Sequence, residues 1–86
     1  MDEKLLKEIE FLLFAAEQLV WKKADHVMTQ LYWDIGHCLR ELKEEELRVM
    51  SHVLSKELNV EARLFETAYY FYRGNPIKKK ALEAAA

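Results

Sequence analysis

The sequence predicts an all-α protein, and three observations lead to this fold class. Leucine, glutamate and alanine, with thirteen, twelve and nine copies, dominate the composition, and all three favour helices. Residues that break helices are scarce, because the 86-residue chain has one proline and two glycines. No segment alternates between apolar and polar residues for long enough to form a strand. At this length we expect one small domain.

A long helix is expected at the start of the chain, over residues 3–42. Asp2 can cap it, because a short side-chain oxygen accepts a hydrogen bond from an unpaired backbone N–H. A straight helix of this length spans roughly 55 Å, and no monomer of 86 residues covers it on both sides. Either the helix breaks near Trp21–Asp25, or a second chain covers its exposed stripe; the dimer is preferred. Apart from Lys23, the stripe is apolar and consists of Leu5, Ile9, Leu12, Ala16, Leu19, Val27, Leu31, Ile35 and Leu39.

Gly36 lies inside this helical pattern, where glycine costs about 1 kcal/mol relative to alanine. We expect it to let another helix approach closely, and a helix break at Gly36 is the alternative. Trp33 and Ile35 beside it are expected to serve the fold rather than a site.

Three shorter helices are expected after residue 44, over residues 45–58, 60–73 and 76–84. The acidic run 44–46 suits the first turn of a helix, where the helix dipole favours negative charge. Asn59 suits the end of that helix, because asparagine tolerates the left-handed conformation. Gly74 should end the next helix, and Asn75 and Pro76 should start the last one.

The net charge of −2 is unevenly divided along the chain. Residues 1–46 carry 11 acidic and 6 basic residues, a net charge of −5, whereas residues 47–86 carry 4 and 7, a net charge of +3. This asymmetry weakly favours a polyanion as partner of the second half, and ordinary solvated charge explains it equally well. With one cysteine, no basic-then-apolar leader pattern and no long apolar run, a cytoplasmic protein is expected, without a membrane-spanning segment.

No residue set indicates catalysis, a metal or a cofactor, so a non-enzyme is expected. The histidines, His26, His37 and His52, do not pair at spacings of three or four, so no helix face presents two imidazoles to one metal ion. His37 and Cys38 are adjacent and point about 100° apart on a helix, which excludes a nucleophile pair. Cys38 is expected to pack as a small apolar residue.

Helix, tight turn at 59–60 and helix is the outline of a helix-turn-helix. In that motif the second helix enters the major groove of DNA, and its first residues meet the bases. Arg63 could contact guanine, whereas the candidate phosphate-binding residues are Arg73, Lys78, Lys79 and Lys80. Glu61 and Glu66 oppose this hypothesis, because acids beside phosphates weaken binding.

Aromatic residues gather at Trp21, Tyr32, Trp33 and the run 69–72. Four consecutive aromatic residues on one helix cannot all face the same core, so some must meet another element or another chain. Core and dimer packing is the preferred interpretation, and stacking on nucleic-acid bases is the alternative.

A resemblance to a known family adds to this interpretation. The segment 31–36, Leu-Tyr-Trp-Asp-Ile-Gly, resembles the Tyr-Trp-x-Ile-Gly motif of the YhcG-type N-terminal domain of predicted bacterial nucleases. Segments 53–58, 62–65 and 69–72 are similar to later parts of that family, so the likeness spans roughly residues 5–76. The resemblance implies a helix-turn-helix-like module that binds DNA and is joined to a separate nuclease domain. The chain departs from the family in its short connection at 59–60, in Arg63 and in Ala68, and the nuclease part has no counterpart here.

Two hypotheses follow from the sequence. The first is a non-catalytic DNA-binding or DNA-targeting module that docks on duplex DNA through the basic residues named above. The second is a homo-oligomerisation or protein-interaction module without a nucleic-acid role, with a homodimer as the first expectation.

Overall fold

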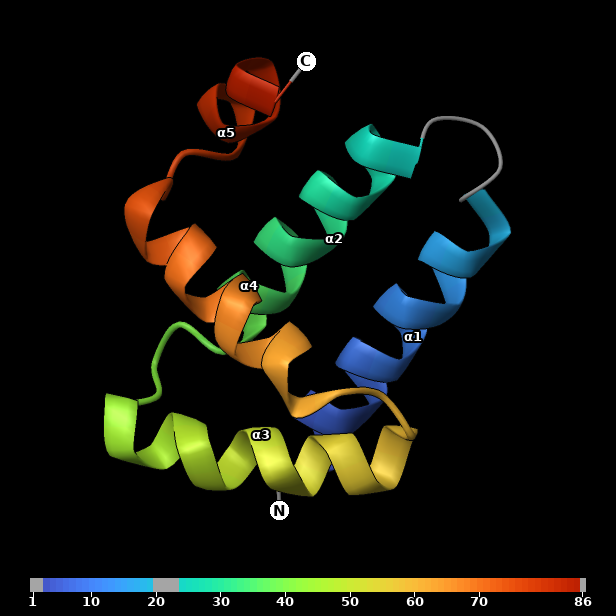
Figure 1. The fold of residues 1–86 in the computed structure, drawn as a ribbon, viewed down its shortest axis with the longest axis vertical. Coiled ribbons are helices and arrows are strands. Elements are labelled where there is room, and N and C mark those ends of the chain that lie inside the picture. Colours follow the sequence, from blue (N-terminus) through green and yellow to red (C-terminus); the bar gives the residue numbers. More distant parts are fainter. Residues whose placement is uncertain (1–2, 20–23, 86) are drawn as a thin grey trace.

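The computed structural model of the chain describes residues 3–19 and 24–85, and these residues form five helices (Figure 1). No strand occurs among them, which confirms the all-α prediction. The helices are α1 (Glu3–Leu19), α2 (Ala24–Cys38), α3 (Glu44–Leu58), α4 (Ala62–Gly74) and α5 (Lys78–Ala85).

The single helix expected over residues 3–42 is wrong. α1 ends at Leu19 and α2 begins at Ala24, and the two pack side by side as an antiparallel hairpin (Figure 1). Folding back lets each apolar stripe cover the other, and Ile9 of α1 and Leu31 of α2 are both buried. A second chain is not needed to cover the stripe, so helix length no longer argues for a dimer.

The C-terminal end of the expected long helix, at residue 42, also differs from the observed one. α2 stops at Cys38, and a turn follows in which the Leu39 N–H donates to the carbonyls of Ile35 and Gly36. The break considered near Trp21–Asp25 falls partly on residues 20–23, which lie outside the described residues, as does the expected cap Asp2.

The core is built around α2. α1, α4 and α5 pack against α2, whereas α3 crosses the bottom of the molecule in Figure 1 and packs against α4. Burial of apolar surface at this junction is the main source of the protein's stability. The buried core residues are Ile9, Leu31, Ile35, Leu39, Leu47, Leu54, Phe65, Ala68 and Tyr69.

At Gly36, the backbones of α2 and α4 lie too close together to leave room for a side chain. A Cβ atom added to Gly36 would lie 2.2 Å from the carbonyl oxygen of Ala68 and 2.5 Å from the Cβ atom of Tyr72. The expectation that Gly36 permits close helix approach is therefore confirmed, and the alternative of a helix break at Gly36 is not observed.

Local contacts hold both ends of α3, and the end at Asn59 is the one that the sequence predicts. The backbone N–H of Lys43 donates to the carboxylate of Glu46 at 3.0 Å, which anchors the start of α3. Asn59 adopts the left-handed conformation, with φ 56° and ψ 46°, and ends α3. Ser55 Oγ donates to the carbonyl of Val60 and holds the turn in place.

The segment after α4 differs from the prediction at Asn75. Instead of starting α5, Asn75 caps the end of α4: its N–H donates to the carbonyls of Phe71 and Tyr72. α5 begins at Lys78, two residues after Pro76. The observed starts and ends of α3, α4 and α5 lie within two residues of those predicted.

Candidate interaction surface

The two faces of α4 have different compositions. Phe65, Ala68 and Tyr69 are buried, and Tyr72 packs beside them against Trp33 of α2. Residues 63, 66, 70 and 73, spaced by three, four and three, form a row along the helix beside this buried face. We call these four residues, Arg63, Glu66, Tyr70 and Arg73, the outer face of α4.

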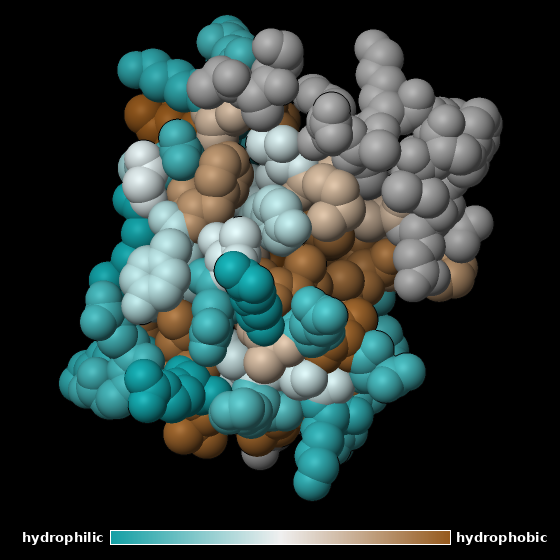
Figure 2. Space-filling view, in the orientation of Figure 1, coloured by the Kyte–Doolittle hydropathy of each residue, from teal (hydrophilic) through white to brown (hydrophobic). Residues whose placement is uncertain are grey.

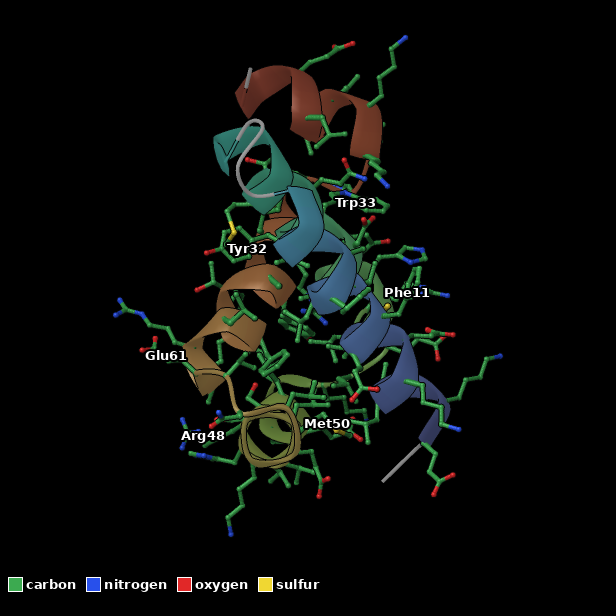
Figure 3. All side chains as sticks on the ribbon, turned by 90° about the vertical axis from the view of Figure 1, so that its right-hand side faces the viewer. Phe11, Tyr32, Trp33, Arg48, Met50 and Glu61 are labelled. Carbon is green, nitrogen blue, oxygen red and sulfur yellow. The ribbon has the colours of Figure 1, made fainter. Side chains whose placement is uncertain are left out.

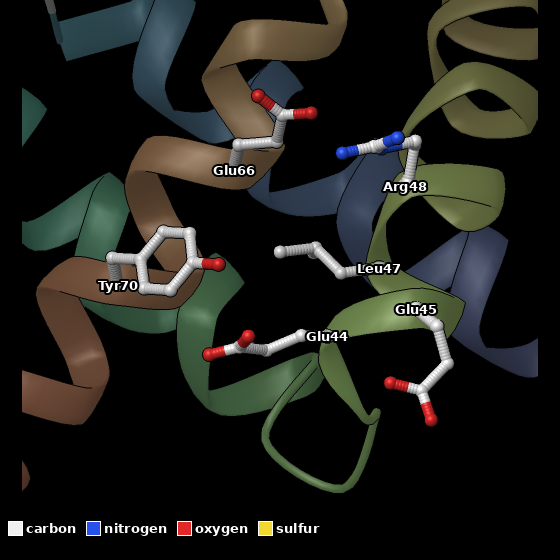
Figure 4. A pocket seen from close by; sticks show the side chains of 6 residues that line it. All are labelled: Glu44, Glu45, Leu47, Arg48, Glu66 and Tyr70. Carbon is white, nitrogen blue, oxygen red and sulfur yellow. The ribbon is translucent and has the colours of Figure 1, made fainter.

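A groove lies between the outer face of α4 and the first turns of α3, and we call it the α3–α4 groove (Figure 4). Its volume is about 510 Å³. Tyr70 and Glu66 project into it from α4, and Leu47 lies between the two helices. The groove is lined by Glu44, Glu45, Leu47, Arg48, Glu66 and Tyr70.

The α3–α4 groove is acidic. Three carboxylates and one guanidinium line it. Two of the carboxylates, those of Glu44 and Glu45, belong to the first turn of α3, where the helix dipole favours negative charge. A groove of this charge disfavours a phosphate backbone, because the acids of its rim repel it.

The basic residues predicted to bind DNA are spread along α4 and α5. Arg63 lies in the first turn of α4 and Arg73 in the last, separated by about 15 Å along the helix axis. Arg73 is exposed, and its guanidinium stacks over the Tyr69 ring at 4.6 Å. Lys79 and Lys80 of α5 are exposed and follow Arg73 in the chain.

Lys78 differs from its two neighbours because it has partners within the chain. Its ammonium lies 2.8 Å from the Asp34 carboxylate of α2 and 5.4 Å from the centre of the Trp33 ring. This ion pair attaches α5 to α2. Binding of a phosphate by Lys78 would compete with it.

Trp33 of α2 contacts α4 and the segment that follows it. Its ring stacks on that of His37, with 5.2 Å between centroids, and meets the edge of the Tyr72 ring at 5.1 Å. Its Nε1–H donates to the Asn75 carbonyl at 2.8 Å. These contacts agree with packing, not base stacking, as the use of this ring. Trp21, the other tryptophan of the predicted aromatic group, lies outside the described residues.

The surface of the rest of the molecule divides into hydrophilic and apolar regions. In Figure 2, hydrophilic side chains cover much of α3 and α4, and apolar side chains reach the surface at the lower edge along α3 and between α1 and α2. Phe11 of α1 is 67% exposed, and it lies on the opposite side of the molecule from Arg48 and Glu61 (Figure 3). It is therefore separate from the α3–α4 groove.

Cys38 of α2 is half-buried and lies beside Glu8 of α1. Burial and, to a smaller extent, the Glu8 carboxylate, 3.7 Å from the sulfur, together raise the pKa of the Cys38 thiol to about 11. A thiol of this pKa is protonated at neutral pH and is a poor nucleophile. Within residues 3–19 and 24–85, no three His, Cys, Asp or Glu side chains come together to hold a metal ion. The side chain of His26 lies outside the described residues.

Sequence reasoning missed the α3–α4 groove, although its components were visible. Glu44 and Glu45 indicated a helix start, and Tyr70 belonged to the aromatic surplus. The signal that could have found the groove is the spacing of the outer face of α4, once the apolar positions of that helix are assigned to the core.

Comparison with known proteins yields no match among protein-family models, curated proteins or solved structures. No helix in the described part of the chain has the length and apolar character needed to cross a bilayer. The fold and the surface define a small all-α module whose most distinctive feature is a helix face of mixed charge around an exposed tyrosine.

Proposed function

We propose that the chain is a non-catalytic helical module that associates with a second copy of itself. The observation that carries the proposal is the position of Tyr70. This side chain is 52% exposed and stands on the outer face of α4 between charged residues of both signs. Tyrosine and arginine are the residue types enriched at protein interfaces, whereas an acidic rim disfavours nucleic acid.

The positions of the four consecutive aromatic side chains, residues 69–72, support this proposal. Tyr69 is buried, Tyr72 packs on Trp33, and Phe71 is half-buried. Tyr70 touches the edge of the Tyr69 ring, and about half of its surface faces solvent. Within the run 69–72, Tyr70 is thus the residue that another chain can cover.

The proposal is tested by sedimentation equilibrium on the unmodified chain, Tyr70→Ala and Phe11→Ala. Phe11→Ala is a matched control, because it removes an exposed aromatic side chain from another side of the molecule. We expect a concentration-dependent dimer for the unmodified chain and for Phe11→Ala, and dissociation at least tenfold easier for Tyr70→Ala. A single mass of 10.2 kDa for the unmodified chain at all concentrations contradicts the proposal.

A DNA-binding module is the second candidate. It is favoured by exposed basic side chains where α4 leads into α5. Arg73, Lys79 and Lys80 are exposed there. The three-residue turn between α3 and α4 and the likeness to the YhcG-type domain also support it. In this case the affinity comes from contacts between these basic side chains and the phosphates, and the acidic α3–α4 groove does not contact the DNA.

Fluorescence anisotropy with a random duplex at about 50 and 200 mM salt tests this second candidate, because phosphate contacts weaken steeply with salt. Lys79→Glu with Lys80→Glu should weaken binding to every sequence. Lys56→Glu on α3, with the same change of sign at an exposed lysine, should weaken it much less. Absence of binding at the lower salt concentration excludes this candidate.

A further inference from the structure

After Arg63 in the first turn of α4, the other three residues of the outer face carry their charges in a fixed order. Glu66 stands one turn before Tyr70, and Arg73 stands about one turn after it. Arg73 and Tyr70 are exposed and Glu66 is half-buried, so all three are open to a partner. Along the helix, an acid, an aromatic ring and a base follow one another over about 10 Å.

When two copies of this helix run antiparallel, the order of charges on one is complementary to the order on the other. The point midway between residues 66 and 73 lies beside Tyr70. If a second α4 packs antiparallel about that point, each Glu66 meets the Arg73 of the other copy, and the two Tyr70 rings meet at the centre. A parallel arrangement in register brings like charges together instead. A two-fold axis repeats every contact, so one favourable pairing is made twice.

The neighbouring elements extend the same order of charge. Glu44 and Glu45 of α3 line the groove beside Glu66, whereas Lys79 and Lys80 of α5 follow Arg73. Ile77, between Arg73 and these lysines, is 55% exposed. The acidic groove of one copy therefore has a charge opposite to that of the segment that follows Arg73 in the other copy.

We infer that two copies of the chain pair antiparallel through the outer face of α4, with Glu66 of each copy against Arg73 of the other. The inference rests on the proposed self-association and names its surface and geometry. It commits to a second copy of this chain as the occupant, because the charges on the face complement their own reversed order.

Charge reversal provides the test, because the two halves of the pairing can be exchanged between variants. In Glu66→Arg, two arginines oppose each other at both ends of the interface. In Arg73→Glu, two glutamates do so. We expect each variant alone to dissociate at least tenfold more easily than the unmodified chain by sedimentation equilibrium. An equimolar mixture of the two should form a mixed dimer, since both of its pairs are then Arg with Glu.

Two controls carry the same charge changes on α3, at exposed positions. Glu57→Arg matches Glu66→Arg, and Lys56→Glu matches Arg73→Glu. Both should dimerise within about threefold of the unmodified chain, because neither residue lies on the outer face of α4. Circular dichroism of every variant establishes that the helices are intact.

The possible failures are distinguishable. If the unmodified chain dimerises and both reversals leave its dissociation constant unchanged, the α4 surface is wrong, although self-association stands. If the reversals dissociate the dimer and their mixture stays monomeric, the antiparallel pairing is wrong. If the unmodified chain is monomeric throughout, the proposed function and this surface fail together.

Discussion

At the scale of single residues, Gly36 sets the distance between α2 and α4. Gly36→Ala should lower the free energy of unfolding by about 2 kcal/mol, because overpacking a core contact typically costs about 1–3 kcal/mol. The atoms in the way are the backbone of Ala68 and the Cβ atom of Tyr72, which cannot rotate aside. Urea denaturation followed by circular dichroism measures the change.

Gly74→Ala is the matched control for that substitution. A Cβ atom at Gly74 meets nothing within 4 Å, and the residue ends α4 without a positive φ. Its free energy of unfolding should stay within about 0.5 kcal/mol of the unmodified chain. Equal effects of the two substitutions contradict the close approach of α2 and α4 at Gly36.

Cys38 gives a prediction about pH. Its pKa is raised from 9.0 to about 11 by burial and then by Glu8, so at pH 8 the folded chain should react with iodoacetamide about 10–100 times more slowly than the unfolded chain. Between pH 9 and 11 the unfolded thiol has lost its proton and the folded thiol keeps it. The contribution of Cys38 to stability is therefore complete below pH 9 and is lost as the pH rises through 11.

Substitution of Glu8 by glutamine checks the cause of this shift. Removing the carboxylate should lower the pKa of the Cys38 thiol and accelerate alkylation at pH 8, whereas Glu10→Gln on the same helix should not. Alkylation of the folded and unfolded chains at equal rates contradicts the assigned environment.

At the scale of the elements, two polar contacts from α2 hold the segment after α4 and the first residue of α5. Trp33→Phe keeps an aromatic ring but removes the hydrogen bond to the Asn75 carbonyl, and should cost about 1 kcal/mol. Asp34→Asn removes the ion pair with Lys78, whose side chain is 41% exposed, and should cost less than about 1 kcal/mol.

Salt separates these two contributions. At about 1 M salt the screening length falls to about 3 Å, so the effect of Asp34→Asn should shrink while that of Trp33→Phe persists. Thermal unfolding at low and high salt measures both. An unchanged effect of Asp34→Asn at high salt means that the ion pair is not what holds α5.

The sequence was informative about elements whose ends are encoded locally. α3 has an acidic first turn and Asn59 at its end, and α4 ends at Gly74, so their bounds were predicted closely. For residues 3–42 the sequence favoured one continuous helix over a division in two, because the apolar spacing continues through the segment between α1 and α2. That division depends on burial of the stripe by the other half of the hairpin, which is a contact between distant residues.

The same limit applies to the candidate surface. Arg73, Lys79 and Lys80, which the sequence predicts to contact phosphates, are exposed. The engagement of Lys78 by Asp34, 44 positions earlier, could not be seen in a local pattern. Neither could the approach of Glu44 to Tyr70, because it requires the crossing of α3 and α4.

At the scale of the whole molecule, a chain of this length has a limited interior. A domain near this size buries roughly 60–65% of the surface that its unfolded chain exposes. Large apolar side chains therefore remain at the surface, among them Phe11, Val49, Tyr70 and Ile77. Pairing through α4 covers Tyr70, with Glu66 and Arg73 on either side of it, and leaves Phe11 on another side.

The most direct test of self-association is the mass of the unmodified chain by sedimentation equilibrium over a wide concentration range, at low and at high salt. The account predicts a reversible approach to twice 10.2 kDa as concentration rises, and weaker association at high salt because charged pairs border the interface. A mass of 10.2 kDa at every concentration and salt contradicts it.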